Sequence, residues 1–400
     1  MSDKNDKQKE RSKRSNRIGI DARFYGKAGP GRYAKNIIKH LEKIDQKNKY
    51  FILLRKDNFE EYIPQNPNFQ KVLADYPWYS WSEQTAFLFK VLSLHLDLFY
   101  VPHFNIPVLY PKKIVTAIPD MIMHTFSTEK GTTLWKPYFR FKKLVYKLVF
   151  KWSVIRSRKI IVPTREVFND FKSVYPKIPN EKFVIATEGI DPDLMNIEVK
   201  NSEQVLEKYK IKKPFLLYLS SMYEHKNVPR LLEAFKILIE KYDFEGNLVL
   251  VGKKDKFSER IWDLVKEMNL VDRVSMPGMQ GFVSDEETVA LRKEAEVYVF
   301  TALKEGFSLT PLEAQYFGLP CVISDIPCHR EVYGDSVLYF NPYDVEDIAE
   351  KIIRVLHDNE LREELIKRGY ERTKIYSWVH TAEKTLDTFN QVLGVKVSAK

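Results

Sequence analysis

Two glutamates eight positions apart, Glu305 and Glu313, carry the strongest chemical signal in the sequence. They bracket the run EGFSLTPLE, which follows an apolar strand-like run and precedes a helix predicted at residues 312–317. Pro311 fits the first turn of that helix, where a missing N–H costs little. The helix start favours phosphate oxygens, and the two carboxylates could accept hydrogen bonds from vicinal sugar or ribose hydroxyls. The plain alternative is a helix start carrying two solvated acids. The ligand-binding loop would comprise Gly306, Phe307, Ser308, Leu309 and Thr310.

A lysine stands at a second strand-to-helix turn. The segment SSMYEHKN follows the apolar run at 214–220 and places Lys226 just before a helix predicted at 228–241. The Lys226 ammonium group could reach a diphosphate there, with Ser221 in the same turn, and Asn227 is a residue type that favours a helix N-cap. A surface lysine with no ligand is the plain alternative.

Glycines and polar residues also follow strand-like runs in the first half of the chain. Gly29 and Gly31 come after the first run, where glycine lets the backbone approach an anion and the following helix start favours that anion. Asp120 and His124 follow the run at 114–118, and His103 ends another run in the same way. These side chains could line a ligand site, although a histidine with a purely structural role is the alternative for both histidines.

Taken together, these motifs resemble the retaining, nucleotide-sugar-dependent glycosyltransferases of family four, the glycosyl transferases group 1, over about residues 17–395. The E-x7-E motif is the most specific element of the resemblance. It implies that Glu305 contacts hydroxyls of the donor sugar, that Glu313 contacts the donor ribose and that Lys226 binds the diphosphate. It also implies that the Gly29 and Gly31 loop lies near the phosphates and the acceptor.

The resemblance implies a reaction as well. A hexose of mannose or glucose type would move from a UDP- or GDP-sugar to a hydroxyl of a saccharide or lipid-linked acceptor, with retention of anomeric configuration. The sequence has no clustered His/Cys ligand set, so we expect a metal-independent enzyme that needs no cofactor. The catalytic group would comprise Glu305, Lys226, Asp120 and His124.

The sequence departs from the family pattern at two places. Pro119 precedes Asp120 where the family has a His-Asp pair, and His225 stands where an arginine usually precedes the lysine. These departures keep open a second class of function, a catalytically weakened nucleotide-sugar-binding scaffold of a polysaccharide assembly system. A UDP-sugar 2-epimerase shares the two-domain shape, but the E-x7-E spacing argues against it.

The elements that must position these residues alternate between short apolar strands and helices, as in parallel sheets covered on both faces. We expect an α/β fold of two Rossmann-like, doubly wound parallel-sheet domains that face a cleft, the GT-B arrangement. The expected parts are a disordered basic tail at 1–16, an acceptor domain at 17–190, a linker at 191–212, a nucleotide-sugar donor domain at 213–375 and a C-terminal helix at 376–400 that crosses back to the first domain.

Composition supports a folded, two-domain protein. The 400 residues are 44% hydrophobic and 30% charged, which excludes a mainly disordered chain. Residues 1–200 carry 36 Lys and Arg against 21 Asp and Glu, net +15, whereas residues 201–400 carry 28 against 33, net −5. With two cysteines, Cys321 and Cys328, no apolar signal segment and no long apolar stretch, we expect a cytoplasmic protein.

Much of the positive charge lies in residues 130–165, which contain eleven Lys and Arg, no acid and many aromatic residues. The apolar positions Phe141, Leu144, Val145, Leu148 and Trp152 suit one face of a helix. In one interpretation that face packs on the core and the basic face is solvated. In the other, the helix meets an anionic membrane surface, which would make the protein peripheral on the inner face of the membrane. No nucleic-acid signature accompanies the charge, so we expect no nucleic-acid partner.

Overall fold

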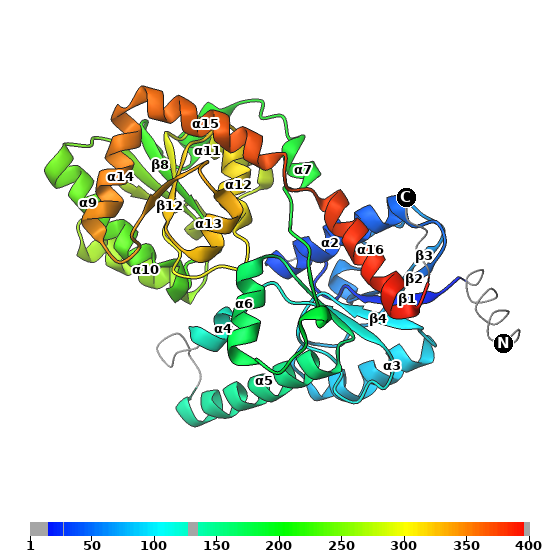
Figure 1. Cartoon of the computed structure of the whole chain (residues 1–400). Coiled ribbons are helices and arrows are strands. Elements are labelled where there is room, and N and C mark those ends of the chain that lie inside the picture. Colours follow the sequence, from blue (N-terminus) through cyan, green and yellow to red (C-terminus); the bar gives the residue numbers. More distant parts are fainter. Residues whose placement is uncertain (1–14, 27, 127–134, 396–400) are drawn as a thin grey trace, which may run out of the picture. The chain divides into compact units, whose positions relative to one another are not determined.

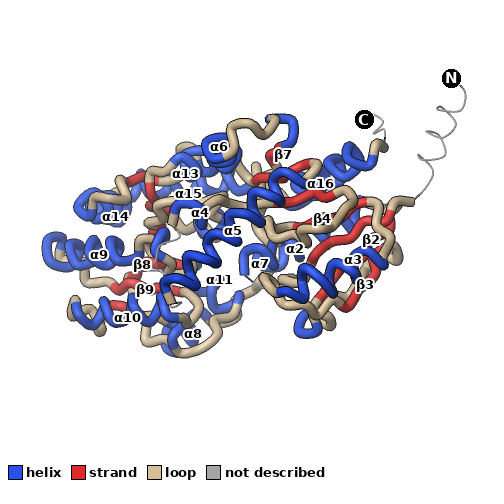
Figure 2. Tube along the Cα trace, turned by 90° about the horizontal axis from the view of Figure 1, so that it is seen from below, coloured by secondary structure: helices blue, strands red, loops and turns tan. Residues whose placement is uncertain are grey.

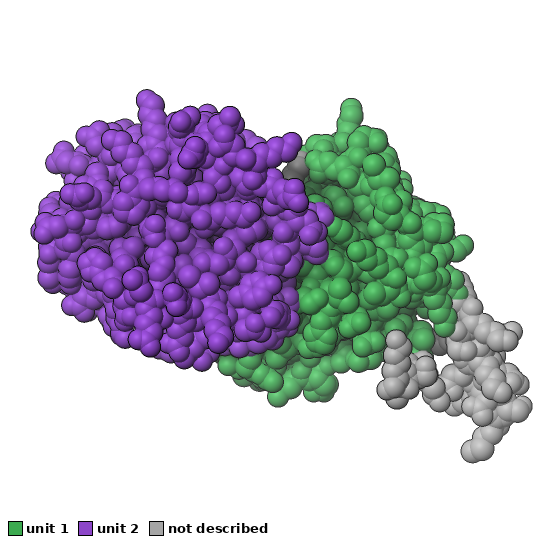
Figure 3. Space-filling model, turned by 90° about the horizontal axis from the view of Figure 1, so that it is seen from above, with its two compact units in different colours: residues 1–124, 132–188, 377–400 green, residues 125–131, 189–376 purple. Residues whose placement is uncertain are grey.

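The computed structural model describes residues 15–26, 28–126 and 135–395, which fold into two compact units (Figure 1). Unit 1 contains the described residues up to His124, residues 135–188 and the chain from Ser377 onward. Unit 2 contains Gly189–Tyr376 together with Thr125 and Phe126. Figure 3 colours unit 1 green and unit 2 purple.

The folded first unit includes a residue that the sequence assigns to the tail. Residues 1–14 of the predicted basic tail lie outside the described residues. Asn16, assigned to the same tail, is instead held in unit 1, because its side chain donates to Asn48 Oδ1 at 2.8 Å and its carbonyl accepts from Lys49 N at 2.9 Å. The tail prediction is therefore wrong for Asn16.

Unit 1 is built on a seven-stranded parallel sheet in the order β3-β2-β1-β4-β5-β6-β7. Its central strands are almost entirely buried, which explains why they read as continuous apolar runs in the sequence. The strands are β1 (Arg17–Asp21), β2 (Lys49–Leu54), β3 (Phe69–Leu73), β4 (Leu98–Val101), β5 (Ile114–Ala117), β6 (Lys159–Val162) and β7 (Phe183–Ile185).

The helices of unit 1 include the last helix of the described chain. α16 packs on α2, where the Tyr33 and Trp378 rings meet edge to face with centroids 5.5 Å apart. The helices are α2 (Ala28–Ile44), α3 (Leu88–Ser93), α4 (Ile122–Thr125), α5 (Lys136–Arg156), α6 (Arg165–Val174) and α16 (Trp378–Leu393), with short turns η1 (Lys56–Asn58) and η4 (Asn180–Lys182) and the π-helical turn η2 (Glu83–Phe87).

Unit 2 is built on a six-stranded parallel sheet in the order β10-β9-β8-β11-β12-β13. β8 pairs with β11 through Leu216–Val297 and Leu217–Tyr298, so the strand order reverses between them. The strands are β8 (Phe215–Leu219), β9 (Asn247–Val251), β10 (Val274–Ser275), β11 (Val297–Phe300), β12 (Cys321–Ser324) and β13 (Leu338–Phe340).

Helices cover this sheet, and several lie against one another: α9 against α14, α12 against α15, and α8 against α11. Cys321 and Cys328 are both buried in its core. The helices are α7 (Pro192–Met195), α8 (Ser202–Lys208), α9 (Val228–Tyr242), α10 (Lys256–Glu267), α11 (Asp285–Glu294), α12 (Leu309–Tyr316), α13 (Pro327–Tyr333), α14 (Val345–His357) and α15 (Asn359–Thr373), with turns η5 (Glu224–Lys226) and η6 (Pro277–Met279).

The segment 191–212, expected as a polar linker, is instead a packed part of unit 2. Leu194, Leu206, Tyr209 and Ile211 are buried in the core of this unit. Tyr209 also donates its hydroxyl to Glu287 at 3.0 Å, which ties the segment to α11. The polar residues that suggested a linker lie on the outside of two short helices.

Within the residues that the structure describes, no helix combines the length and the apolar character that crossing a bilayer requires.

Candidate functional site

The two sequence motifs of unit 2 meet at the place where its strand order reverses. Lys226 follows β8 and Glu305 follows β11, and these strands are neighbours in the sheet. In open parallel sheets, ligands bind beyond the carboxyl ends of the strands at such a reversal. The fold therefore brings both side chains to the edge where a ligand site is expected.

Lys226 and Glu305 form a direct ion pair. Lys226 Nζ lies 2.5 Å from Glu305 Oε1, and the two side chains are only 11% and 8% exposed. Two hydrogen bonds also join the loops: Leu303 N donates to His225 O at 2.7 Å, and the Thr301 hydroxyl donates to Lys226 O at 2.9 Å. A buried ion pair within such a frame holds a cation and an anion at fixed positions, because separating two opposite charges in a buried place is costly.

The loop between the two glutamates is held by a buried histidine. His329 Nδ1 lies 2.8 Å from Ser324 O, and because a carbonyl only accepts, this nitrogen carries the proton. His329 Nε2 therefore accepts the hydroxyl of Ser308, at 3.0 Å. Burial, with a contribution from the charge of Lys226, lowers the pKa of His329 to about 3, so the ring stays neutral.

Ser308 has a left-handed backbone (φ 70°), an uncommon conformation for a residue with a side chain. The Ser308 carbonyl also accepts a hydrogen bond from the Tyr333 hydroxyl, so both the side chain and the carbonyl of Ser308 are held in place. This turn sends the chain into α12, which begins at Leu309 rather than at the predicted residue 312. Pro311 is consequently the third residue of the helix, a position still inside the first turn.

Glu313 is placed differently from the sequence expectation. It lies in the second turn of α12 and pairs with Arg292 of α11, and the two side chains are only 3% and 2% exposed. Nothing in the sequence marks Arg292, because one arginine in a charged helix is unremarkable. The structure therefore brings Glu305 to Lys226 and Glu313 to Arg292, in two separate ion pairs.

The other predicted donor residues have mixed surroundings. Gly306 and Phe307 are buried, and the Phe307 ring packs edge to face on Tyr376. Leu309 and Thr310 are half-buried at the start of α12. Ser221 is half-buried as well, and its carbonyl accepts the Tyr218 hydroxyl at 2.7 Å.

Asn227 does not cap α9 with its side chain, in contrast to the prediction. Its backbone is left-handed (φ 58°), and its amide donates to Pro342 O at 2.8 Å while its Oδ1 accepts from Arg230. Asn227 instead connects the Lys226 turn to the chain after β13. Burial and the neighbouring Lys226 charge lower the pKa of His225 to about 3, so His225 does not supply the positive charge of the arginine that it replaces.

Unit 1 has a hollow of about 160 Å³ beyond the carboxyl ends of its strands. Two carboxyl groups, Asp120 and Glu188, lie in its lining together with the start of α2. Burial, followed by the charge of Asp120, raises the pKa of Glu188 to about 7. The full lining is Gly29, Pro30, Tyr33, Pro102, Ala117, Ile118, Pro119, Asp120, Ile161, Val162, Pro163, Ala186 and Glu188.

The two predicted glycines of unit 1 have different roles in the fold. Both lie in the first turn of α2 rather than in a loop before it. A Cβ on Gly31 would lie 2.0 Å from the carbonyl oxygen of Phe24, so only glycine fits there. A Cβ on Gly29 would meet nothing within 4 Å, and Gly29 lines the hollow. Gly29 is thus placed to let a ligand approach, whereas Gly31 is needed for packing.

His124 does not join Asp120 in the lining of this hollow. Its Nδ1 lies 2.8 Å from the Tyr146 hydroxyl, and its ring packs edge to face on Phe150, with centroids 4.5 Å apart. Burial lowers the pKa of His124 to about 4. The prediction that His124 lines a ligand site together with Asp120 is therefore wrong for the hollow of unit 1, because aromatic residues of α5 hold the His124 ring.

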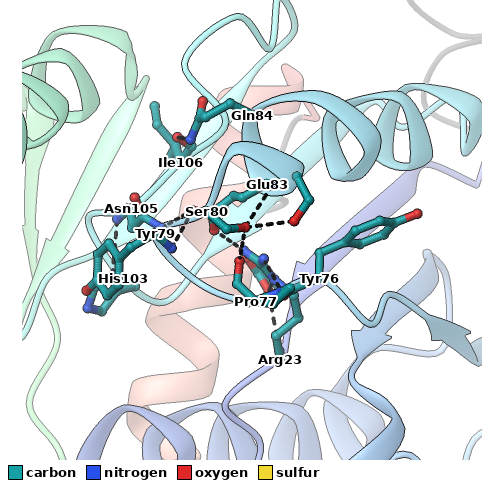
Figure 4. Close-up of polar contacts among 12 residues, drawn as sticks. Arg23, Tyr76, Pro77, Tyr79, Ser80, Glu83, Gln84, His103, Asn105 and Ile106 are labelled. Atoms are coloured by element: carbon teal, nitrogen blue, oxygen red, sulfur yellow. Dashed lines mark hydrogen bonds and ion pairs between the residues drawn. The ribbon is translucent and has the colours of Figure 1, made fainter.

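A buried charge network, which sequence reasoning missed, lies after β1 and β4 of unit 1 (Figure 4). Arg23 binds Asp21 at 2.8 Å and Glu83 at 2.6 Å, and all three side chains are fully buried. Glu83 also accepts from Asn105 Nδ2 at 2.6 Å, and Asn105 N donates to His103 Nδ1 at 3.1 Å. The network therefore fixes the turn that carries His103. This turn follows β4 and Pro102, and Pro102 lines the hollow of unit 1.

Electrostatics sets the protonation of this network. Burial alone would lower the pKa of Arg23, but the carboxylates of Asp21 and Glu83 raise it above its ordinary value. Burial and the charge of Arg23 lower the pKa of His103 to about 3. His103 is therefore a neutral ring that accepts through Nδ1 and holds its proton on Nε2.

A family model and two curated relatives match this chain. Residues 201–372 match the family model described as "Glycosyl transferases group 1". These residues form a glycosyl transferases group 1 domain. The O-antigen chain mannosyltransferase B of Escherichia coli is 31% identical over 186 residues, 46% of this chain. The serotype-specific mannosyltransferase WbdA of Escherichia coli is 28% identical over 222 residues, 55% of this chain. The chain spans 48% of the first relative and 27% of the second.

Solved structures extend the likeness to nearly the whole chain. The sucrose-phosphate synthase of Thermosynechococcus elongatus has a TM-score of 0.74 at 18% identity, covering 95% of this chain and all of the other. The Anabaena protein HepE, solved in complex with UDP-glucose, has a TM-score of 0.72 at 13% identity, covering 94% of this chain and all of the other. The group 1 domain and unit 1 thus share the GT-B fold of these structures.

The residues that the sequence did not single out are Arg292, His329, Arg23, Glu83 and Glu188. Each of these residues interacts with a partner on another element, so no local spacing in the sequence could identify it. Among the residues that the structure describes, no three His, Cys, Asp or Glu side chains gather closely enough to hold a metal ion.

Proposed function

We propose that this protein is a glycosyltransferase that moves a hexose of mannose or glucose type from a UDP- or GDP-sugar to a hydroxyl of a saccharide or lipid-linked acceptor. The Lys226–Glu305 ion pair at the strand reversal of unit 2 carries the proposal. The family match over residues 201–372 and the mannosyltransferase names of two relatives support it. HepE, which shares the fold, was solved with UDP-glucose.

The charges of the pair fit the needs of such a reaction. When the bond between the sugar and the diphosphate breaks, negative charge grows on the leaving diphosphate. The Lys226 ammonium group stabilises that charge, and its fixed position means that little reorganisation is needed as the reaction proceeds. Glu305 holds Lys226 in place before the donor binds, and its carboxylate accepts from sugar hydroxyls once the diphosphate takes over the ammonium group.

The proposed chemistry retains the anomeric configuration. The carbon–oxygen bond to the diphosphate breaks, a new bond forms on the same face to the acceptor oxygen, and the acceptor proton goes to the leaving phosphate. In this proposal, the steps need neither a metal ion nor a cofactor. We assign the acceptor to unit 1, where Asp120 and Glu188 line the hollow and can accept hydrogen bonds from saccharide hydroxyls.

The first experiment is a donor panel followed by variants of the pair. Thermal shift with UDP, GDP, ADP and their sugar conjugates identifies the donor, since a ligand that binds only the folded state raises Tm. Lys226→Met and Glu305→Gln are then assayed for donor consumption and sugar transfer. We expect turnover to fall by at least about 100-fold in each, in the range of losing one charged group at a transition state.

A matched control keeps that result interpretable. Lys241 and Glu346 form an exposed ion pair at 2.8 Å elsewhere in unit 2, so Lys241→Met removes an ammonium group without touching the proposed site. This variant should retain full turnover. Wild-type turnover in both Lys226→Met and Glu305→Gln would remove this pair from the mechanism.

A second candidate function rests on a specific observation. Pro119 stands in the lining of the hollow where the family pattern has histidine, and His124 is held by aromatic residues of α5. A nucleotide-sugar-binding scaffold of a polysaccharide assembly system would keep the donor contacts and lack turnover. Calorimetric binding of a nucleotide sugar, with no transfer to any acceptor pool, would favour this function over the enzyme.

A further inference from the structure

Helix α5 has apolar residues on two sides, and only one of these sides packs on the core of unit 1. The side chains that contact the core are Tyr146, Phe150 and Val154, of which the last two are fully buried. The apolar residues on the other side are 40–61% exposed: Phe141, Leu144, Val145, Leu148, Trp152 and Ile155. Their spacing of three and four residues places them on one face of the helix.

This exposed apolar face, which we call the α5 stripe, contradicts the first interpretation of the sequence. Phe141, Leu144, Val145, Leu148 and Trp152 are the residues that the sequence pattern assigned to a core-facing side, and they lie outside instead. In Figure 2, α5 runs as one long helix along the outer side of unit 1. Several adjacent large apolar side chains on one outer face mark an interaction site rather than scattered surface residues.

The charges of α5 indicate the chemistry of the partner. Residues 136–156 contain seven Lys and Arg and no Asp or Glu. Lys147 and Lys151, both exposed, precede Leu148 and Trp152 and therefore lie along the side of the stripe. A protein partner with an ordinary apolar interface would have no need for a uniformly basic border, whereas an anionic lipid surface would attract it.

The apolar surface continues beyond the helix. Trp152 Nε1 donates to Val108 O at 2.8 Å, and Arg156 donates to Tyr110 O at 2.9 Å. These bonds hold the neighbouring loop against the end of α5, and Leu109, between the two acceptors, is 74% exposed. Leu109 thus extends the stripe with an apolar side chain on a fixed loop.

We propose that the α5 stripe and Leu109 insert into the interface of an anionic lipid bilayer, with the basic residues of α5 contacting the headgroups. The helix would lie in the plane of the interface, as basic amphipathic helices do. Its 21 residues give it a length of about 30 Å, enough for several lipid headgroups along one side. The surface lies wholly in unit 1 and does not depend on the proposed transfer reaction.

The test is sedimentation of the full chain with vesicles of phosphatidylcholine alone or with 30% phosphatidylglycerol. We expect binding to the anionic vesicles and at least tenfold weaker binding to the neutral ones. Lys147→Glu with Lys151→Glu should weaken the anionic binding by about 25-fold or more, from about fivefold per lysine. Leu144→Gln with Leu148→Gln should weaken it by about tenfold or more, since each change removes apolar area that the bilayer would cover.

Two control variants match these changes in unit 2. Lys253→Glu with Lys254→Glu reverses two exposed charges, and Phe282→Ser removes a side chain that is 89% exposed. Both should bind vesicles as the wild type does. Circular dichroism and thermal melting, measured on every variant, show that each is folded. Nucleotide binding, measured separately, tests the proposed function, so a failure of one proposal can be told from a failure of the other.

Three results would overturn the proposal. One is equal binding of the wild type to neutral and anionic vesicles, and another is unchanged binding of the Leu144→Gln, Leu148→Gln variant. The third is a change from dimer to monomer in that variant, without any vesicle binding by the wild type. This last result would assign the α5 stripe to a second copy of the chain.

Discussion

The buried pair of Arg292 and Glu313 allows a prediction that separates a structural role from a ligand-binding role. Glu313→Gln keeps the shape of the side chain and removes its charge. The Arg292 guanidinium group, 2% exposed, would then be buried without its counter-charge. Breaking one side of a buried ion pair costs about 3–5 kcal/mol of unfolding free energy. For a unit of this size that lowers Tm by about 10 °C.

The assay is differential scanning calorimetry of the wild type, Glu313→Gln and a double variant. Arg292→Met with Glu313→Met removes both charges and should recover most of the lost stability, since a buried pair can be replaced by apolar groups of similar volume. Nucleotide affinity, measured at a temperature where all three proteins are folded, reports any separate contribution of Glu313 to the donor. A Glu313→Gln variant that unfolds at the wild-type temperature would refute the reasoning, as would a double variant no more stable than the single one.

Three further predictions concern unit 1. Gly31→Ala should lower Tm sharply, because its Cβ would lie 2.0 Å from Phe24 O, whereas Gly29→Ala should unfold as the wild type does. Arg23→Met should cost more than about 3–5 kcal/mol of unfolding free energy by chemical denaturation, because it leaves two buried carboxylates unpaired. Glu188 has a pKa raised to about 7, so the folded state holds its proton more tightly and stability falls by up to about 3 kcal/mol as pH rises from about 4.5 to 7. Glu188→Gln should therefore gain Tm relative to the wild type at pH 8 but not at pH 4, and an equal difference at both pH values would contradict the assignment.

The sequence was sufficient for the sheets and for the pairing of the two main motifs. Buried strands such as β11 stand out as apolar runs, and the doubly wound sheet that they predict brings Lys226 and Glu305 to neighbouring strand ends. The start of α12 was misplaced by three residues, because the left-handed turn at Ser308 depends on His329 and Tyr333, which come later in the chain.

The direction of a helix face is harder to derive than its periodicity. In α5 the apolar spacing is real, but the core lies on the side of Tyr146 and Phe150. Both sides of the helix carry large apolar residues, so the pattern alone could not tell which side is covered. Similarly, the polar composition of residues 191–212 gave no indication that Leu206 and Tyr209 anchor the segment in a core.

The position of α16 has a consequence for how the chain acquires its structure. Unit 1 needs this helix, which rests on α2 and donates from Thr381 and Lys384 to the carbonyls of Thr187 and Ile185. A ribosome delivers α16 only after all of Gly189–Tyr376 has emerged. Unit 1, whose synthesis starts first, can therefore be completed only after unit 2 has been synthesised. Until then, the surface of α2 that α16 covers is exposed, while unit 2 can already fold.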